Sequence, residues 1–222
     1  MIQSALKAIR QLPDPAFRKL LLQSLGLTVL LLLGIGAAAF YGIGFIPEFE
    51  TGWLNDVIGW LAGLGVVIGS IWLLIPVTAI FIGIFLDQIA DAVEAQHYPA
   101  DPPSRDPPLS ETLIMALRFT AIMVVANILV LPLYLLPVAN LAIFYGLNGY
   151  LLGREYFEMV AIRHHDAATV KALRQQHSLR ITLAGILIAL PLVIPVFNLI
   201  VPLFGAAFMV HVYKGLASRQ AV

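Results

Sequence analysis

The sequence Pro137-Val138-Ala139-Asn140-Leu141 returns 58 residues later as Pro195-Val196-Phe197-Asn198-Leu199. Each copy lies near the middle of an uncharged stretch, residues 119–152 in the first case and residues 181–210 in the second. A proline inside a helix removes a backbone hydrogen bond and interrupts the helix. The repeated Pro-x-x-Asn therefore predicts a turn within each stretch.

The lengths of these two stretches decide how each can sit in a membrane. Crossing a hydrocarbon core of roughly 30 Å takes about 20 helical residues, so two crossings and a turn need about 42 or more. The stretches contain 34 and 30 residues, which is too long for one crossing and too short for two. Half-helices of about 15 residues reach only about 22 Å. We therefore expect two re-entrant hairpins, with two complete but very short crossings as the alternative.

The composition excludes several classes of protein. Of the 222 residues, 60% are hydrophobic and 12% are charged, the mean hydropathy is +0.90, and the formal net charge is zero. This balance indicates an all-α integral membrane protein and gives no reason to expect a nucleic acid partner. Cysteine is absent, which excludes disulfides, thiolate metal sites and cysteine nucleophiles.

The first half of the chain predicts two long transmembrane helices. Residues 2–12 gather apolar side chains on one helical face and predict a short interfacial helix, after which Pro15 is expected to open the first span, residues 16–46. The uncharged run in this span is too long for the core of a signal peptide, so we expect it to be retained. The second span covers residues 53–94, and Gly59-xxx-Gly63 and Gly65-xxx-Gly69 predict close helix packing.

The rest of the chain completes a single membrane domain of residues 1–222. The end of the second span is an amphipathic tail, followed by a loop at residues 98–108 whose five prolines exclude a helix. We then expect the first hairpin at 112–152, a cytoplasmic helical segment at 153–180 and the second hairpin at 181–212.

The charges support this layout. With re-entrant hairpins, all 13 lysines and arginines fall on one side of the membrane, whereas the loop between the two spans carries three acids and no base. The positive-inside rule then places both termini and the mouths of both hairpins in the cytoplasm. A single crossing by each interrupted stretch would put the five bases of residues 153–180 outside, which the rule opposes.

The two breaks are candidate sites for an anion. A helix broken in lipid frees carbonyl and amide groups that cannot stay unpaired. Asn140 and Asn198 are each expected to cap the second half-helix, where free amides favour negative charge. The alternative is that both asparagines only pair the broken backbone. Pro137, Asn140, Pro195 and Asn198 are thus the candidate residues for the lining of a path.

The start of the first span is a second candidate site. Arg18 and Lys19 lie in its first turn, where the helix dipole disfavours a cation, so a negative partner is expected nearby. That partner is a permeant anion, a lipid phosphate or Asp14.

The remaining charged groups suggest little catalytic chemistry. Asp87, Asp91 and Glu94 share one helical face, either as a solvated helix end or as partners for Arg154, Arg163 or Lys171 in gating or assembly, a role in which Glu155 is also a candidate. No charged residue interrupts the four apolar runs, so the carboxylate of a proton relay is missing. Neither a phosphate-binding loop nor histidines spaced to bind a metal together are present. We expect no enzyme activity, no cofactor and no metal.

Two stretches resemble the CysZ/etoposide-induced-protein superfamily, whose bacterial members are described as sulfate permeases or channels. One is residues 194–206, including Pro195-Val196-Phe197-Asn198-Leu199, and the other is residues 150–164, including Gly153-Arg154-Glu155-Tyr156-Phe157-Glu158. The resemblance implies two long helices plus two partly penetrating hairpins, a homo-oligomer in the bacterial inner membrane, and sulfate uptake for cysteine synthesis. The anion-binding Gly-apolar-Arg of the family would fall on Ala16-Phe17-Arg18, where Ala16 replaces the glycine.

The leading hypothesis is an inner-membrane permease or channel for sulfate or a similar oxyanion. Arg18 and Lys19 would hold the anion, and the residues at the breaks would line or gate its path. The rival hypothesis is a membrane scaffold or lipid-binding assembly protein that transports nothing, because no charged residue in the apolar core defines a pore.

Overall fold

The computed structural model describes residues 1–43, 52–130, 132 and 140–217, and every element within these ranges is helical. This confirms the all-α fold class. The two 3₁₀ helices named below are labelled η. The elements are α1 (Ile2–Gln11), α2 (Pro15–Ile43), α3 (Gly52–Ile84), α4 (Leu86–His97), α5 (Leu109–Val130), α6 (Asn140–Ala161), α7 (Ala167–Gln176), α8 (Ser178–Ala189), η2 (Leu190–Val193), η3 (Pro195–Leu199) and α9 (Val201–Ala217).

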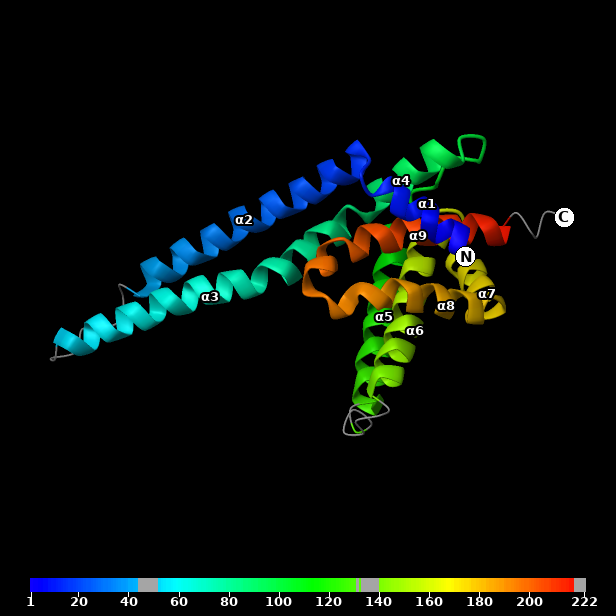
Figure 1. Ribbon diagram of the computed structural model, residues 1–222. Helices are drawn as coiled ribbons and strands as arrows, with labels where there is room; N and C mark the ends of the chain where they lie inside the picture. The colour runs from blue at the N-terminus through cyan, green and yellow to red at the C-terminus, as the bar shows by residue number, and fades with distance from the viewer. Residues whose placement is uncertain (44–51, 131, 133–139, 218–222) are drawn as a thin grey trace.

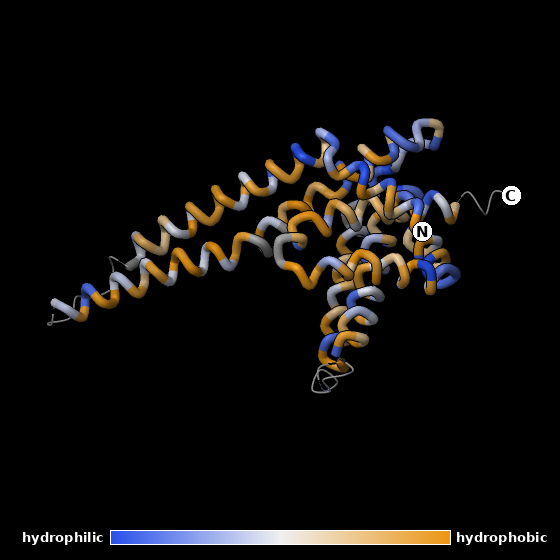
Figure 2. Tube along the Cα trace, viewed as in Figure 1, coloured by the Kyte–Doolittle hydropathy of each residue, from blue (hydrophilic) through white to orange (hydrophobic). Residues whose placement is uncertain are grey.

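Two pairs of helices project from a common body in different directions (Figure 1). The helices α2 and α3 lie side by side as one arm, and α5 and α6 form the other, the first hairpin. The second hairpin consists of α8 and α9 and lies in the body, with η2 and η3 between its helices. Hydrophilic residues gather around α1, α4 and α7, whereas the arms are mainly hydrophobic (Figure 2). We call the region around α1, α4 and α7 the polar end.

Several local predictions are confirmed. Pro15 is the first residue of α2, where its fixed φ suits a helix and its missing N–H costs nothing. The loop with five prolines is non-helical up to Pro108, and the acids after the second span lie on α4. A further cap, which was not predicted from the sequence, lies at the start of α7, where the Asp166 side chain accepts a hydrogen bond of 3.0 Å from the Thr169 N–H.

Three helices are long and apolar enough to cross a membrane, by length and composition: residues 15–42, 52–74 and 110–130. The third, within α5, corrects the prediction of half-helices of about 15 residues in the first hairpin. Both α5 and α6 have 22 residues, or about 33 Å. The helices are longer than predicted because they extend beyond the uncharged stretch at both ends. The helix α5 begins at Leu109, before Arg118, and α6 continues to Ala161, beyond Glu158.

The second hairpin has shorter helices. The helix α8 has 12 residues and α9 has 17, and α8 is bent by 86° from the preceding α7. Such a bent pair is either a broken span or a re-entrant segment. Partial penetration of the membrane by either hairpin stays a prediction.

Glycines allow the two hairpins to touch backbone to backbone. A methyl group on Gly185 of α8 would overlap the carbonyl oxygen of Gly149 and lie 2.7 Å from the Cα of Gly153, both on α6. Glycine is needed at this contact because the two backbones leave no room for a Cβ. Its conformational freedom is not the reason, since no glycine in the described residues has a positive φ. The predicted packing of the glycine pairs on α3 is not found among the described residues of this chain, none of which has an atom within 4 Å of a Cβ built at any of the four: Gly59, Gly63, Gly65 and Gly69.

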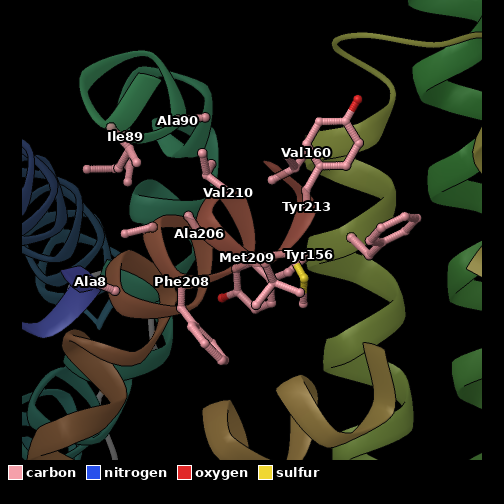
Figure 3. Packing of buried hydrophobic residues seen from close by; sticks show 14 of the residues in the cluster. Ala8, Ile89, Ala90, Tyr156, Val160, Ala206, Phe208, Met209, Val210 and Tyr213 are labelled. Atoms are coloured by element: carbon pink, nitrogen blue, oxygen red, sulfur yellow. The ribbon is translucent and has the colours of Figure 1, made fainter. Parts of the chain in front are cut away.

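The hydrophobic core is centred on α9. Figure 3 shows Ala206, Met209 and Val210 of this helix between side chains of α4 and α6. The N-terminal helix α1 also packs on α9, burying Ala8 and Gln11 while it leaves its other face exposed. The core therefore joins both hairpins and α4 at the polar end, and the arms extend from it.

Candidate functional site

The cations at the start of α2 lie on the outside of the molecule. Arg18 and Lys19 are exposed and line a shallow hollow together with Pro15, Leu22 and Gln23. Phe17, directly before them, is buried in the core, which turns the two cations outward. No carboxylate that the structure describes, Asp14 included, forms an ion pair with either cation. Their charges are therefore available to an anion or a lipid phosphate.

The break in the second hairpin differs from the expectation in one respect. Asn198 lies inside η3, and α9 begins at Val201, so Asn198 does not occupy the N-cap position of α9. The chain instead passes the break in two 3₁₀ turns, in which the Phe197 N–H donates to the Ile194 carbonyl at 3.0 Å and the Ile200 N–H donates to the Phe197 carbonyl at 2.8 Å. Two amides at this break are thus satisfied by the chain itself. The Oδ1 atom of Asn198 is buried and accepts no hydrogen bond from the described residues.

The break in the first hairpin is described only in part. Asn140 is the first residue of α6 and is exposed. Pro137 lies outside the described residues. Pro195 begins η3 in the second hairpin.

The acidic face of α4 is a binding site for cations of the chain. The buried guanidinium of Arg163, just after α6, reaches Asp87 at 3.4 Å and Glu94 at 3.2 Å, and it also pairs with Asp91. Of the three partners considered for these acids, Arg163 is therefore the one that contacts them. Arg154 pairs elsewhere, and Lys171 is exposed on α7.

Glu94 is the centre of this cluster. Its carboxylate lies 2.7 Å from His164 Nε2 and 3.5 Å from Lys214 Nζ, so residues that follow α6 and residues of α9 converge on α4. Burial opposes its ionisation, but the hydrogen bond with His164 and the charges of Lys214 and Arg163 outweigh burial and lower the pKa of Glu94 to about 2. The carboxylate is therefore ionised at neutral pH.

A second ionic cluster joins α6 to α7. The Arg154 Nε atom donates to Glu158 Oε1 at 2.9 Å, one helical turn away, and both side chains are buried. The Arg174 Nε atom lies 2.9 Å from the same oxygen, as an ion pair whose angle does not make a hydrogen bond. Glu155 is exposed and lines a hollow between α5 and α6 that Glu158 and Asp87 also line.

A network of uncharged polar groups links the first and last helices. The buried Gln11 Nε2 atom of α1 donates to Gln96 Oε1 of α4 at 2.7 Å, and Gln11 Oε1 lies 3.1 Å from His211 Nε2 of α9. The other nitrogen of His211 lies 2.9 Å from the Tyr98 hydroxyl. None of these residues was predicted from the sequence, because a single glutamine and a single histidine 200 positions apart carry no motif.

These contacts join helices to one another. In the part of the chain that the structure describes, no group of three or more histidine, cysteine, aspartate or glutamate side chains is placed to hold a metal ion. The clusters fasten α1, α4, α7 and the second hairpin to one another at the polar end. The exposed cations of α2 stand apart from the clusters.

Comparison with known proteins identifies the family. No curated protein matches the sequence. A family model described as "Sulfate transporter CysZ/Etoposide-induced protein 2.4" matches residues 4–202, nearly the whole chain. The match includes both breaks, the acidic face of α4 and the start of α2, and it confirms the resemblance drawn from the sequence. With its long apolar helices, the chain is therefore a membrane protein that belongs to the CysZ/etoposide-induced protein 2.4 family.

Proposed function

We propose that this protein is a permease or channel of the bacterial inner membrane that carries sulfate or a similar oxyanion, supplying sulfate for cysteine synthesis. The path is passive. Both termini and the mouths of the two hairpins face the cytoplasm, and the working form is a homo-oligomer. The membership of a family that includes sulfate transporters supports this function.

One observation carries the proposal: two adjacent cations at the start of a membrane-spanning helix have no acidic partner among the residues that the structure describes. Every ion pair in the described residues involves other cations, several of them buried, whereas Arg18 and Lys19 stay exposed beside a hollow. Two positive charges at the end of an apolar helix attract a divalent anion and hold it by charge-assisted hydrogen bonds. We therefore assign anion capture to Arg18 and Lys19.

The breaks have a secondary role in this proposal. Pro137 and Asn140 in the first hairpin, and Pro195 and Asn198 in the second, would line or gate the path. Two backbone amides at the second break already donate hydrogen bonds within the chain, whereas Asn198 Oδ1 accepts none from the described residues. The side chain of Asn198 is therefore a better candidate to line the path than these backbone amides. Asp87, Asp91 and Glu94 would anchor the hairpins during gating or assembly, with Arg154 and Glu155 on the neighbouring helix.

The test is the uptake of labelled sulfate into proteoliposomes. We expect protein-dependent uptake that falls at least tenfold in a variant carrying Arg18→Ala and Lys19→Ala. The matched control carries Lys171→Ala and Arg180→Ala, which also removes two exposed cations, and it should transport as the wild type does. Absence of protein-dependent flux, or equal flux in both double variants, would refute the assignment.

A membrane scaffold that transports nothing is the second candidate. The observation in its favour is that η3, at the break of the second hairpin, packs against α3 and α9. Packing of this kind closes a break instead of exposing it to a permeant ion. The scaffold hypothesis predicts binding to anionic lipid with no flux and no competition by sulfate at Arg18.

A further inference from the structure

An apolar groove lies between α1 and the tip of the second hairpin. Ile9 and Leu12 form the α1 wall, and side chains from the second hairpin form the other, among them Leu187, Pro191, Phe197 and Phe204. Its volume of about 360 Å³ is within the range of pockets that hold small molecules. Every side chain of the lining is apolar, so the groove suits hydrocarbon and not a polar ligand.

The chemistry of α1 indicates which kind of molecule supplies the hydrocarbon that would occupy the groove. The helix buries Ala8 and Gln11 against α9 and exposes Ile2, Leu6 and Ile9. An amphipathic helix of this kind lies in the membrane interface, with its apolar face between the head groups and the acyl chains. The groove extends from this helix toward the hairpin tip, and so from the interface toward the hydrocarbon.

The charges of α1 complement an anionic head group. Its ten residues include Lys7 and Arg10 and no acid, and Arg10 directly follows the groove residue Ile9. Both cations are exposed, and the long side chains of lysine and arginine can keep their charges at the head groups while their stems cover apolar surface. Basic residues at the cytoplasmic surface attract anionic lipids.

We propose that the groove binds one acyl chain of an anionic phospholipid whose head group is held by Lys7 and Arg10. An acyl chain suits an entirely apolar groove because it carries no polar group that needs a hydrogen-bond partner there. The bound chain contacts Pro191 of η2, before the break, and Phe197 of η3, within it, so the lipid supports the backbone at the break. This site is independent of whether the protein carries anions.

Tryptophan fluorescence can test this site directly. The three tryptophans, Trp53, Trp60 and Trp72, all lie on α3. Replacing them with phenylalanine and introducing Phe197→Trp puts a single reporter in the groove. In proteoliposomes, we expect brominated phosphatidylglycerol to quench this reporter with a relative binding constant about 25-fold above that of brominated phosphatidylcholine, since each of the two cations contributes roughly a factor of five. Phe204→Trp is a second reporter if the first variant does not fold.

Two controls separate a specific site from the surrounding lipid. A protein that keeps only Trp72, which is 77% exposed on α3, should be quenched equally by the two lipids. Lys7→Gln with Arg10→Gln should reduce the preference at the groove reporter to about one, whereas Lys171→Gln with Arg180→Gln should leave it unchanged. Equal quenching by both lipids at the groove reporter would mean annular lipid only. No quenching by either lipid would mean that protein fills the groove, and either result would overturn the proposal.

Discussion

The contact between the hairpins predicts a large effect for a single methyl group. In Gly185→Ala, the new Cβ would lie 2.7 Å from the Cα of Gly153 and would also overlap the Gly149 carbonyl oxygen. Carbon atoms pack best at about 3.5–4.0 Å, so α6 and α8 must separate by about 1 Å. The obstructing atoms are backbone and cannot rotate away. Overpacking costs about 1–3 kcal/mol, partly offset by the higher helix propensity of alanine.

We expect a net loss of about 2 kcal/mol for Gly185→Ala, or an apparent Tm lower by about 4–8 °C for a chain of this size. The assay is the loss of the monodisperse peak in size-exclusion chromatography after heating in mild detergent. The matched control is Gly146→Ala on α6, where no atom of the described residues lies within 4 Å of the added methyl group. Its Tm should stay the same or rise by a few degrees. Equal melting of the two variants would refute the close contact between the hairpins.

Three further predictions concern the polar end. Glu94→Gln removes one carboxylate that Arg163 and Lys214 share, but Arg163 keeps Asp91 and Lys214 keeps Asp101 at 2.9 Å, so the variant should cost about 2 kcal/mol, measured as a Tm fall of about 4–8 °C. The pKa of Glu94 is lowered from 4.5 to about 2, so its contribution to the stability of the folded protein is complete above pH 4.5 and is lost as the pH falls toward 2. The difference in Tm between the wild type and Glu94→Gln should therefore become smaller from pH 5 to pH 3. A constant difference would contradict that pKa. Asp166→Ala removes the cap of α7 and should lower the Tm in the same assay, whereas Asp166→Asn, which can still cap, should lower it much less; equal falls in Tm would argue against capping.

The sequence predicted the features that depend on local patterns. Apolar runs located the long helices, Pro15 marked the start of α2, and the prolines before Pro108 located the loop. The acidic face of α4 came from helical periodicity, and Arg163 was among the partners considered for it. The family resemblance rested on short motifs and was confirmed over residues 4–202.

The features that depend on distant contacts were missed. The spacing Gly-xxx-Gly occurs at Gly59 and Gly63 and again at Gly149 and Gly153, and the sequence does not say which pair meets another helix. Helix length was underestimated in the first hairpin because Arg118 and Glu158 lie within helices, where the predicted half-helices had been confined to uncharged residues. The position of Asn198 within a 3₁₀ turn depends on the packing of the whole break.

The pairing of α1 with α9 has a consequence for biogenesis. The arm of α2 and α3 is formed by neighbours in the chain and can assemble soon after both helices leave the ribosome. The contact between Gln11 and His211, by contrast, cannot form until His211 has been synthesised, 200 residues later. At a typical synthesis rate of about 5–20 residues per second, that interval lasts roughly 10–40 s. During this time the buried face of α1 needs a temporary cover, and the membrane interface, which already suits its opposite face, is the nearest surface that can supply one.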